Sequence, residues 1–144
     1  MKFSRRYTTS GQDPYENIAF RTAVSEIKNP DGSIVFQLKD IEVPAHWSQV
    51  ASDIIAQKYF RKAGVPSKLK AVEENSVPSW LWRHVADEKA LAKKPESERS
   101  GSEKSAKQVF DRLAGTWTYW GWKGGYFSTE EDARTYFDEM RYML

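Results

Sequence analysis

The feature that most constrains this chain is an aromatic- and glycine-rich run, residues 115–127, that leads into a helical segment reaching the last residue, Leu144. Three of the six tryptophans lie in this run: Trp117, Trp120 and Trp122. A helix normally ends with Gly or Asn just past its last turn, and no such residue follows here. We therefore expect the chain to be cut off rather than finished, with apolar surface at this end facing something absent.

The composition fits one domain with a small core. At 144 residues the chain is long enough to fold as a single unit. Its mean hydropathy is −0.71 and 29% of its residues are charged, whereas 14% are aromatic, so the core should gather in a few aromatic-rich stretches. The chain has no Cys, which excludes disulfides, thiolate metal sites, Cys nucleophiles and cysteine radicals within it.

Charge and hydropathy also limit the partners. The first residues contain no apolar signal-peptide core, and no stretch approaches the roughly 20 apolar residues of a membrane span. The net charge is only +2, far from the strong basic excess of a dedicated nucleic-acid binder. We expect a cytoplasmic protein with no membrane partner and no dedicated nucleic-acid function.

The sequence divides into four segments. Residues 1–17 show no period of either kind and are interpreted as an N-terminal arm. Residues 18–86 contain a β-hairpin followed by helices. Residues 87–104 carry charges of both signs with few large apolar groups, which is typical of a flexible loop. Residues 105–144 form an aromatic helical hairpin.

Alternation of apolar residues predicts the β-hairpin on both sides of the turn Asn29-Pro-Asp-Gly32. Pro30 suits the second turn position, and Gly32 tolerates the positive φ that closes a type I turn with a bulge. The alternating residues are Ile18, Phe20 and Val24 before the turn and Ile34, Phe36 and Leu38 after it.

Four helices follow from spacing and capping. A stripe of Trp47, Val50, Ala51, Ile54, Ile55 and Tyr59 predicts an amphipathic helix that stops at Gly64. A brief helix is expected after Ser79, with Trp80, Val85 and Leu81 packing inward. Residues 106–122 form the next helix. Ser128 and Glu131 have the spacing of a capping box that opens the last one, with Ala133, Phe137, Met140 and Leu144 as its buried stripe.

Five stretches resemble the N-terminal region of bacterial class II ribonucleotide reductases, which depend on adenosylcobalamin. They are residues 25–36, 40–45, 48–66, 77–83 and 105–134, and they extend over most of the chain. The resemblance implies that the parent enzyme reduces ribonucleotides, as diphosphates, to deoxyribonucleotides for DNA synthesis. It also implies that the enzyme has a ten-stranded α/β barrel, in which a cobalt–carbon bond breaks homolytically. A thiyl radical then removes a ribose hydrogen, and a cysteine pair reduces the sugar. Without Cys, this segment alone should be inactive.

On this basis the fold class is α+β, a mainly helical pre-barrel domain with an N-terminal β-hairpin, truncated before the catalytic barrel. The expected role is scaffolding or docking. Its partners would be the barrel of the same enzyme, substrate and nucleotide effectors through the missing domains, and a second copy of the parent. Adenosylcobalamin would be bound by the parent and not by this segment alone. The residues expected to contact the barrel are Trp117, Trp120, Trp122, Phe137 and Met140.

No catalytic, cofactor-binding or metal residue is assigned. His46 and His84 are the only imidazoles, lie far apart in sequence, and neither fits the Asp-x-His-x-x-Gly pattern of histidine-on cobalamin proteins. Lys123 is flanked by glycines, as in an anion site, but the full phosphate-loop spacing is absent.

An independent binding module is the alternative. The hairpin is loosely similar to the ATP-cone regulatory module, although Asn29 and Pro30 replace its usual basic pair. The aromatic run could also stack single-stranded bases. The residues available for stacking and phosphate contact are Trp117, Tyr119, Trp120, Trp122 and Tyr126 with Lys107, Arg112 and Lys123.

Overall fold

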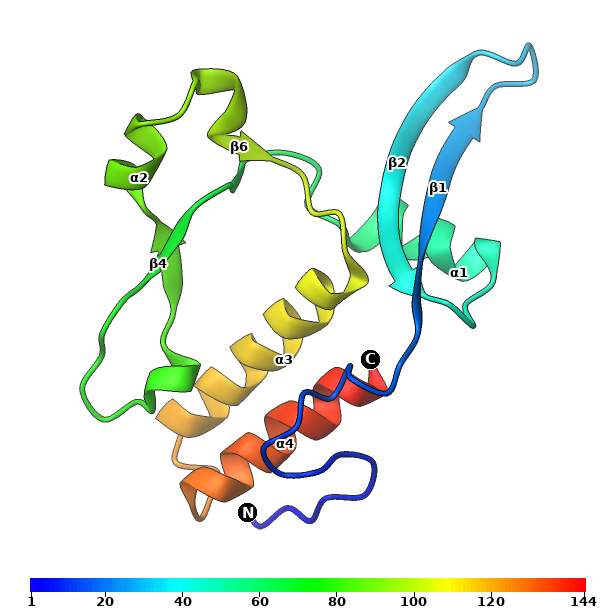
Figure 1. Cartoon of the computed structure of the whole chain (residues 1–144). Coiled ribbons are helices and arrows are strands. Elements are labelled where there is room, and N and C mark those ends of the chain that lie inside the picture. Colours follow the sequence, from blue (N-terminus) through cyan, green and yellow to red (C-terminus); the bar gives the residue numbers. More distant parts are fainter.

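A computed structural model describes all residues, 1–144, as a protruding β-hairpin, a pair of antiparallel helices and a long excursion between them (Figure 1). The α+β class is confirmed in its coarse form, because four α-helices combine with three two-stranded antiparallel sheets. The elements are β1 Phe20–Lys28, β2 Ile34–Pro44, α1 Gln49–Ile54, a π-helical turn Ile55–Tyr59, β3 Val65–Pro66, β4 Leu69–Ala71, a 3₁₀ turn Ser79–Leu81, β5 His84–Ala86, α2 Glu88–Ala92, a 3₁₀ turn Glu96–Glu98, β6 Ser100–Gly101, α3 Ala106–Lys123 and α4 Glu130–Met143.

The hairpin of β1 and β2 is confirmed, together with its turn. The Gly32 amide donates to the Asn29 carbonyl oxygen at 2.9 Å, and Gly32 has φ of 85°, the conformation that glycine adopts at least cost. The Asp31 carboxylate accepts from the Ser33 amide at 2.8 Å and fixes the far side of the turn.

The side-chain alternation expected for β1 is wrong at Val24. Ala23 pairs with Ile41 and Ser25 pairs with Leu38, so two residues of β2 stand opposite Val24. One of them, Asp40, has φ of 56°, which marks a β-bulge. Ala23 and Ser25 therefore point into the core, and Val24 is left 44% exposed on the outer face.

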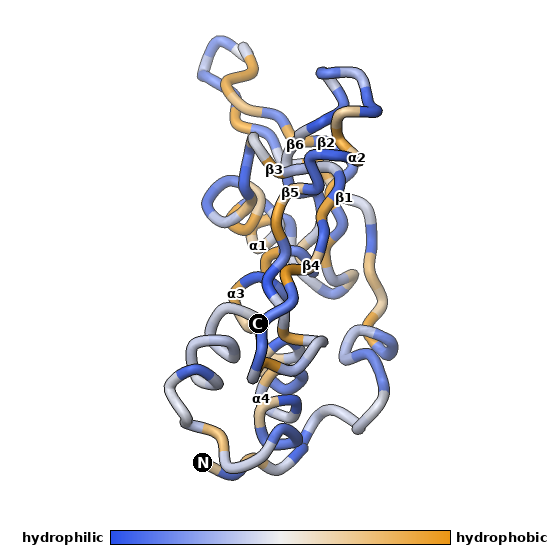
Figure 2. Tube along the Cα trace, turned by 90° about the vertical axis from the view of Figure 1, so that its left-hand side faces the viewer, coloured by the Kyte–Doolittle hydropathy of each residue, from blue (hydrophilic) through white to orange (hydrophobic).

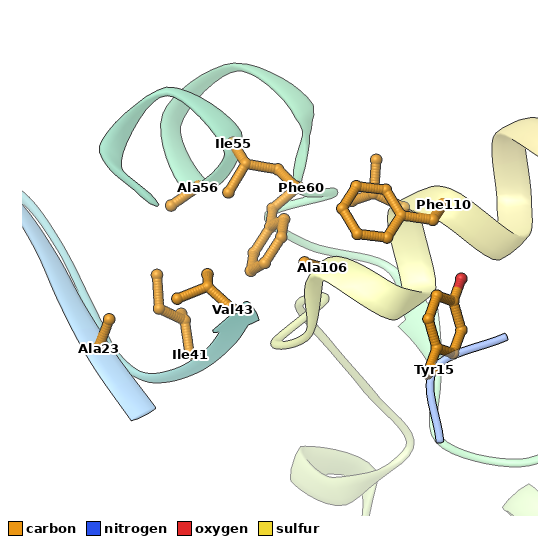
Figure 3. Packing of buried hydrophobic residues seen from close by; sticks show 10 residues of the cluster. Tyr15, Ala23, Ile41, Val43, Ile55, Ala56, Phe60, Ala106 and Phe110 are labelled. Atoms are coloured by element: carbon orange, nitrogen blue, oxygen red, sulfur yellow. The ribbon is translucent and has the colours of Figure 1, made fainter. Parts of the chain in front are cut away.

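The main core lies where α1, its π turn and the start of α3 pack on the hairpin (Figure 3). Ser48 caps α1 by accepting from the Ala51 amide at 3.2 Å. The buried members of this core are Tyr15, Ala23, Ile41, Val43, Ile55, Ala56, Phe60, Ala106, Val109 and Phe110.

The apolar stripe expected on α1 is partly wrong. Val50, Ile54 and Tyr59 are more than half exposed, while Ile55 and Ala56 are buried. The reason is the π turn, in which the Phe60 amide donates to the Ile55 carbonyl oxygen five residues back at 3.0 Å. The wider turn brings Ile55, Ala56 and Phe60 into the same core.

In Figure 1 the excursion of residues 60–104 lies above α3 at the left, and the hairpin lies at the right, beyond the start of α3. The helix expected over residues 79–86 is wrong beyond one 3₁₀ turn, because His84–Ala86 pairs with Leu69–Ala71 as strands β5 and β4. Leu81 is buried as expected, but Val85 is 39% exposed. The segment expected to be a plain loop contains α2, a 3₁₀ turn and β6, with Leu91 buried.

The two long helices are confirmed. α3 opens with a capping box of Ser105 and Gln108. The cap of α4 differs by one residue from the expectation, since Thr129 and not Ser128 accepts from the Asp132 amide at 3.1 Å. The Phe137 ring of α4 packs on α3 at Gly115, where an added Cβ would lie 3.8 Å from it, an ordinary van der Waals contact.

Apolar stretches are short throughout the chain. Figure 2 shows brief hydrophobic segments separated by hydrophilic ones along the whole trace. None of the helices combines the length and apolar character needed to cross a membrane.

Candidate functional site

The five residues expected to contact a barrel have different surroundings. Trp120 is 64% exposed, whereas Trp117, Trp122, Phe137 and Met140 are half-buried. The Trp122 indole donates to the Ser76 carbonyl oxygen at 2.6 Å. The Phe137 ring packs against Trp80, with ring centroids 5.7 Å apart. Of the five, Trp120 is the one that offers most of its surface to a partner.

A second exposed aromatic residue lies near Trp120. Tyr126 is 60% exposed, and its ring rests on Gly124, where an added Cβ would be 3.2 Å from it. The Gly124 amide donates to the Trp120 carbonyl oxygen at 2.9 Å, and the Tyr126 amide donates to the Gly121 carbonyl oxygen at the same distance. The end of α3 therefore presents two large aromatic side chains, Trp120 and Tyr126, which we name the aromatic end.

Lys123 is already paired. Its ammonium lies 2.7 Å from a Glu74 carboxylate oxygen, and the Tyr119 hydroxyl donates to the other oxygen at 2.7 Å. The hydrogen bonds from Lys123 and then Tyr119 hold the pKa of Glu74 below its usual range. A phosphate at Lys123 would have to displace this carboxylate. Tyr119 and Trp122 are likewise engaged within the chain, which leaves Trp120 and Tyr126 for base stacking.

The N-terminal arm docks along α4, a contact that the sequence analysis missed. Asp132 accepts from the Phe3 amide at 2.8 Å. Glu139 accepts from the amides of residues 6, 7 and 8 at 2.9–3.3 Å and from the Thr8 hydroxyl at 2.6 Å. Burial raises the pKa of Glu139, but the Thr8 hydroxyl and these amides outweigh it and lower that pKa overall.

Asp138 is the centre of the charged part of this contact. Its side chain is 1% exposed and lies 2.9 Å from Arg5, 2.8 Å from Arg141 and 3.4 Å from Arg134. Two further carboxylates balance the charge of the arginines. Glu131 forms an ion pair with Arg5 at 3.2 Å, and Asp111 forms one with Arg141 at 3.4 Å. Burial alone would lower the pKa of Arg5, yet its hydrogen bonds to Asp138 and Glu131 raise it. Arm and helix are thus joined by a buried ion cluster.

A signal for this cluster is present in the sequence, although the sequence analysis did not use it. Asp132, Thr135 and Asp138 recur at three-residue steps and are all buried. Such a polar stripe on an otherwise amphipathic helix calls for a polar partner. The arm, with Lys2, Arg5 and Arg6 and no acid before Asp13, provides it.

A hollow of about 670 Å³ lies beside this cluster, between the arm, Trp80 and α4. The Arg134 guanidinium lies 4.9 Å from the Trp80 ring centroid, and the Trp80 indole donates to Glu130 at 2.9 Å. Charges of both signs line the hollow: Asp13, Glu130, Glu131, Arg134 and Arg141. This mixture gives no preference for an anion.

Comparison with known proteins assigns the family. Residues 21–144 match the family described as class II vitamin B12-dependent ribonucleotide reductase. The vitamin B12-dependent ribonucleotide reductase of Agrobacterium fabrum is 70% identical over the whole chain, and that of Bradyrhizobium diazoefficiens is 67% identical over the whole chain. The one from Rhodopirellula baltica is 26% identical over 99% of the chain. The chain spans only 11–12% of the length of these relatives. It belongs to the class II vitamin B12-dependent ribonucleotide reductase family.

Proposed function

We propose that the chain is the N-terminal region of a cytoplasmic enzyme that reduces ribonucleoside diphosphates to deoxyribonucleotides for DNA synthesis. The support is the 70% and 67% identity to vitamin B12-dependent ribonucleotide reductases. Radical reduction needs cysteines, and this chain has none, so the chemistry belongs to other parts of the enzyme. The role of this segment is to dock on the catalytic barrel of the same enzyme, whose assembly is a homodimer.

The residues of this chain do not fit cobalamin. His46 follows β2 and His84 lies in β5, and both are exposed on separate elements. No group of three or more His, Asp or Glu side chains is arranged to hold a metal ion. The hollow beside α4 is lined by charged side chains with Trp80 as its one apolar residue, unlike the mainly apolar pocket that a large cofactor requires. No step of the reaction is assigned to these residues.

The observation that carries the docking role is the aromatic end. Trp120 and Tyr126 are each at least 60% exposed at the close of an 18-residue helix. Exposed tryptophan and tyrosine side chains are the usual anchors of protein interfaces. The helix that carries them is held firmly by α4, the arm and the buried ion cluster. An interface built on such a rigid element loses little entropy on binding.

The test is assembly from two polypeptides. This chain is mixed with the remainder of the Agrobacterium fabrum relative, from which the matching segment has been removed, and ribonucleoside diphosphate reduction is measured with added adenosylcobalamin. We expect the chain to restore activity, and Trp120→Ala to raise the concentration needed at least tenfold. Tyr59→Ala, which removes another exposed aromatic residue at 56% exposure, is the matched control and should behave as wild type. Equal assembly by Trp120→Ala and wild type would refute the aromatic end as the docking site.

The same chain tests the alternative function. Titration with ATP, dATP and a single-stranded oligonucleotide should show no binding at micromolar concentration if the segment only docks. Tight, salt-sensitive binding of the oligonucleotide that Trp120→Ala abolishes would instead favour a nucleic-acid-binding module.

A further inference from the structure

The first eight residues contact α4 in the way that a bound peptide contacts its receptor. The arm has no helix or strand of its own, and three alternate side chains anchor it. Phe3 packs on Phe127 and Tyr136, with ring centroids 5.8 Å and 5.2 Å apart. Arg5 reaches Asp138, and Tyr7 stacks on Tyr142 with centroids 5.4 Å apart. Anchors at every second residue are the mark of an extended peptide read from one side.

Carboxylates of α4 bind the main chain between these anchors. Asp132 accepts from the Phe3 amide, and Glu139 accepts from three successive amides and the Thr8 hydroxyl. The charges are complementary, because the arm brings Lys2, Arg5 and Arg6 to a face of α4 that carries four acids. These acids are Glu131, Asp132, Asp138 and Glu139. Together with Phe127 and Tyr136 they form the surface that we name the arm groove.

The arm can leave the groove without breaking the rest of the fold. Release of the arm would uncover the rings of Phe127, Tyr136 and Tyr142 together with the four carboxylates, which water can hydrate. Asp138 would keep Arg134 and Arg141 as partners. The arm is joined to the core at Tyr15 by residues 9–14, a turn in which Gly11 has φ of 79°. Seven residues from Thr8 to Tyr15 span up to about 25 Å when extended, enough to reach a neighbouring molecule.

We propose that the arm groove is a peptide-recognition site and that the arm of a second copy of this chain occupies it in an exchanged dimer. The contacts of the exchanged arm are those of the closed form, and only the turn at residues 9–14 changes. Exchange of an identical element is a low-cost route to a dimer. It would add a reciprocal contact between two copies next to the aromatic end, because the Met1 ammonium of the arm donates to the Tyr126 carbonyl oxygen.

A fluorescent peptide of residues 2–9 tests the recognition. The receptor is the full chain with Phe3→Ala and Arg5→Ala, whose own arm is weakened and whose groove is intact. We expect saturable binding in fluorescence anisotropy, at least tenfold weaker binding to wild type, whose own arm competes, and no binding of a scrambled peptide. Adding Glu139→Ala to the receptor should weaken binding at least tenfold. Absence of binding to a receptor that keeps its helix content would overturn the proposal.

Complementary variants test the second copy as the occupant. The full chain with Glu139→Ala has an intact arm and a weakened groove. The full chain with Phe3→Ala and Arg5→Ala has a weakened arm and an intact groove. Light scattering on the mixture should show dimers at concentrations where each variant alone is a monomer. A mixture that stays monomeric while the peptide binds would refute exchange between copies. Phe3→Ala alone, which keeps the Arg5–Asp138 pair, serves as the receptor if the double variant loses its helix content.

Discussion

Replacing Asp138 by Asn should destabilise this chain more than any other removal of a single charge. Asn keeps the shape of the side chain but leaves Arg5 and Arg141, which are 15% and 11% exposed, without their nearest anion. Breaking a buried ion pair from one side costs about 3–5 kcal/mol. Glu131 and Asp111 still face the two arginines, so we expect the lower end of that range, about 3 kcal/mol.

The assay is urea unfolding followed by tryptophan fluorescence. With a slope of about 2 kcal/mol per molar urea, Asp138→Asn should lower the midpoint by about 1.5 M, and the melting temperature should fall by about 10 °C. The matched control is Glu26→Gln, which breaks the exposed pair with Lys28 at 2.9 Å and should leave the midpoint unchanged. A midpoint for Asp138→Asn within 0.3 M of wild type, as an order-of-magnitude limit, would refute the view that the cluster holds the arm and α4 together.

Three further outcomes are expected. Gly121→Ala places a Cβ 2.7 Å from the Phe127 ring, against which Phe3 packs. The substitution should lower the free energy of unfolding by about 1–3 kcal/mol in the same assay. No loss of stability would mean that the ring can move aside. Ser105→Ala removes the cap of α3 and should cost about 1 kcal/mol, with Ser128→Ala, which is not a cap, costing less. Folding lowers the pKa of Glu139, so the contribution of this carboxylate to stability is complete above its ordinary pKa of 4.5 and is lost as the pH falls through its pKa in the folded chain. Glu139→Gln should therefore reduce the loss of stability between about pH 5 and pH 3. An unchanged dependence of stability on pH would contradict the contact of Glu139 with the arm.

Local signals predicted the elements whose cause is local. The turn at Asn29–Gly32 and the spacing of Val109, Phe110 and Leu113 depend on residues a few positions apart, and both the hairpin and α3 were confirmed. The cap of α4 was displaced by one residue because Ser128 and Thr129 are both good caps. Ser128 instead contacts the arm, where its amide donates to the Met1 carbonyl oxygen at 3.0 Å.

Contacts between distant segments could not be predicted in the same way. The bulge opposite Val24 and the π turn after Ile54 each change which residues face inward, and neither leaves a periodic signal. The pairing of His84–Ala86 with Leu69–Ala71 involves strands too short to show alternation. In the candidate site, Trp120 is the most exposed of the five residues expected to contact a barrel, and that contact stays a prediction. The arm groove was missed because Asp132 and Asp138 look like solvent-facing residues until the arm is placed against them.

The bulge at Asp40 makes β2 a strand with two registers. On one side of it Phe36 and Leu38 are half-buried, and on the other side Ile41 and Val43 are fully buried, although the two pairs differ in parity. Loss of one residue at the bulge would turn one of these pairs to solvent, whereas residues added at the hairpin tip would alter no pairing below it. Length variation among homologous chains should therefore be found at the tip and be absent at residues 39–40.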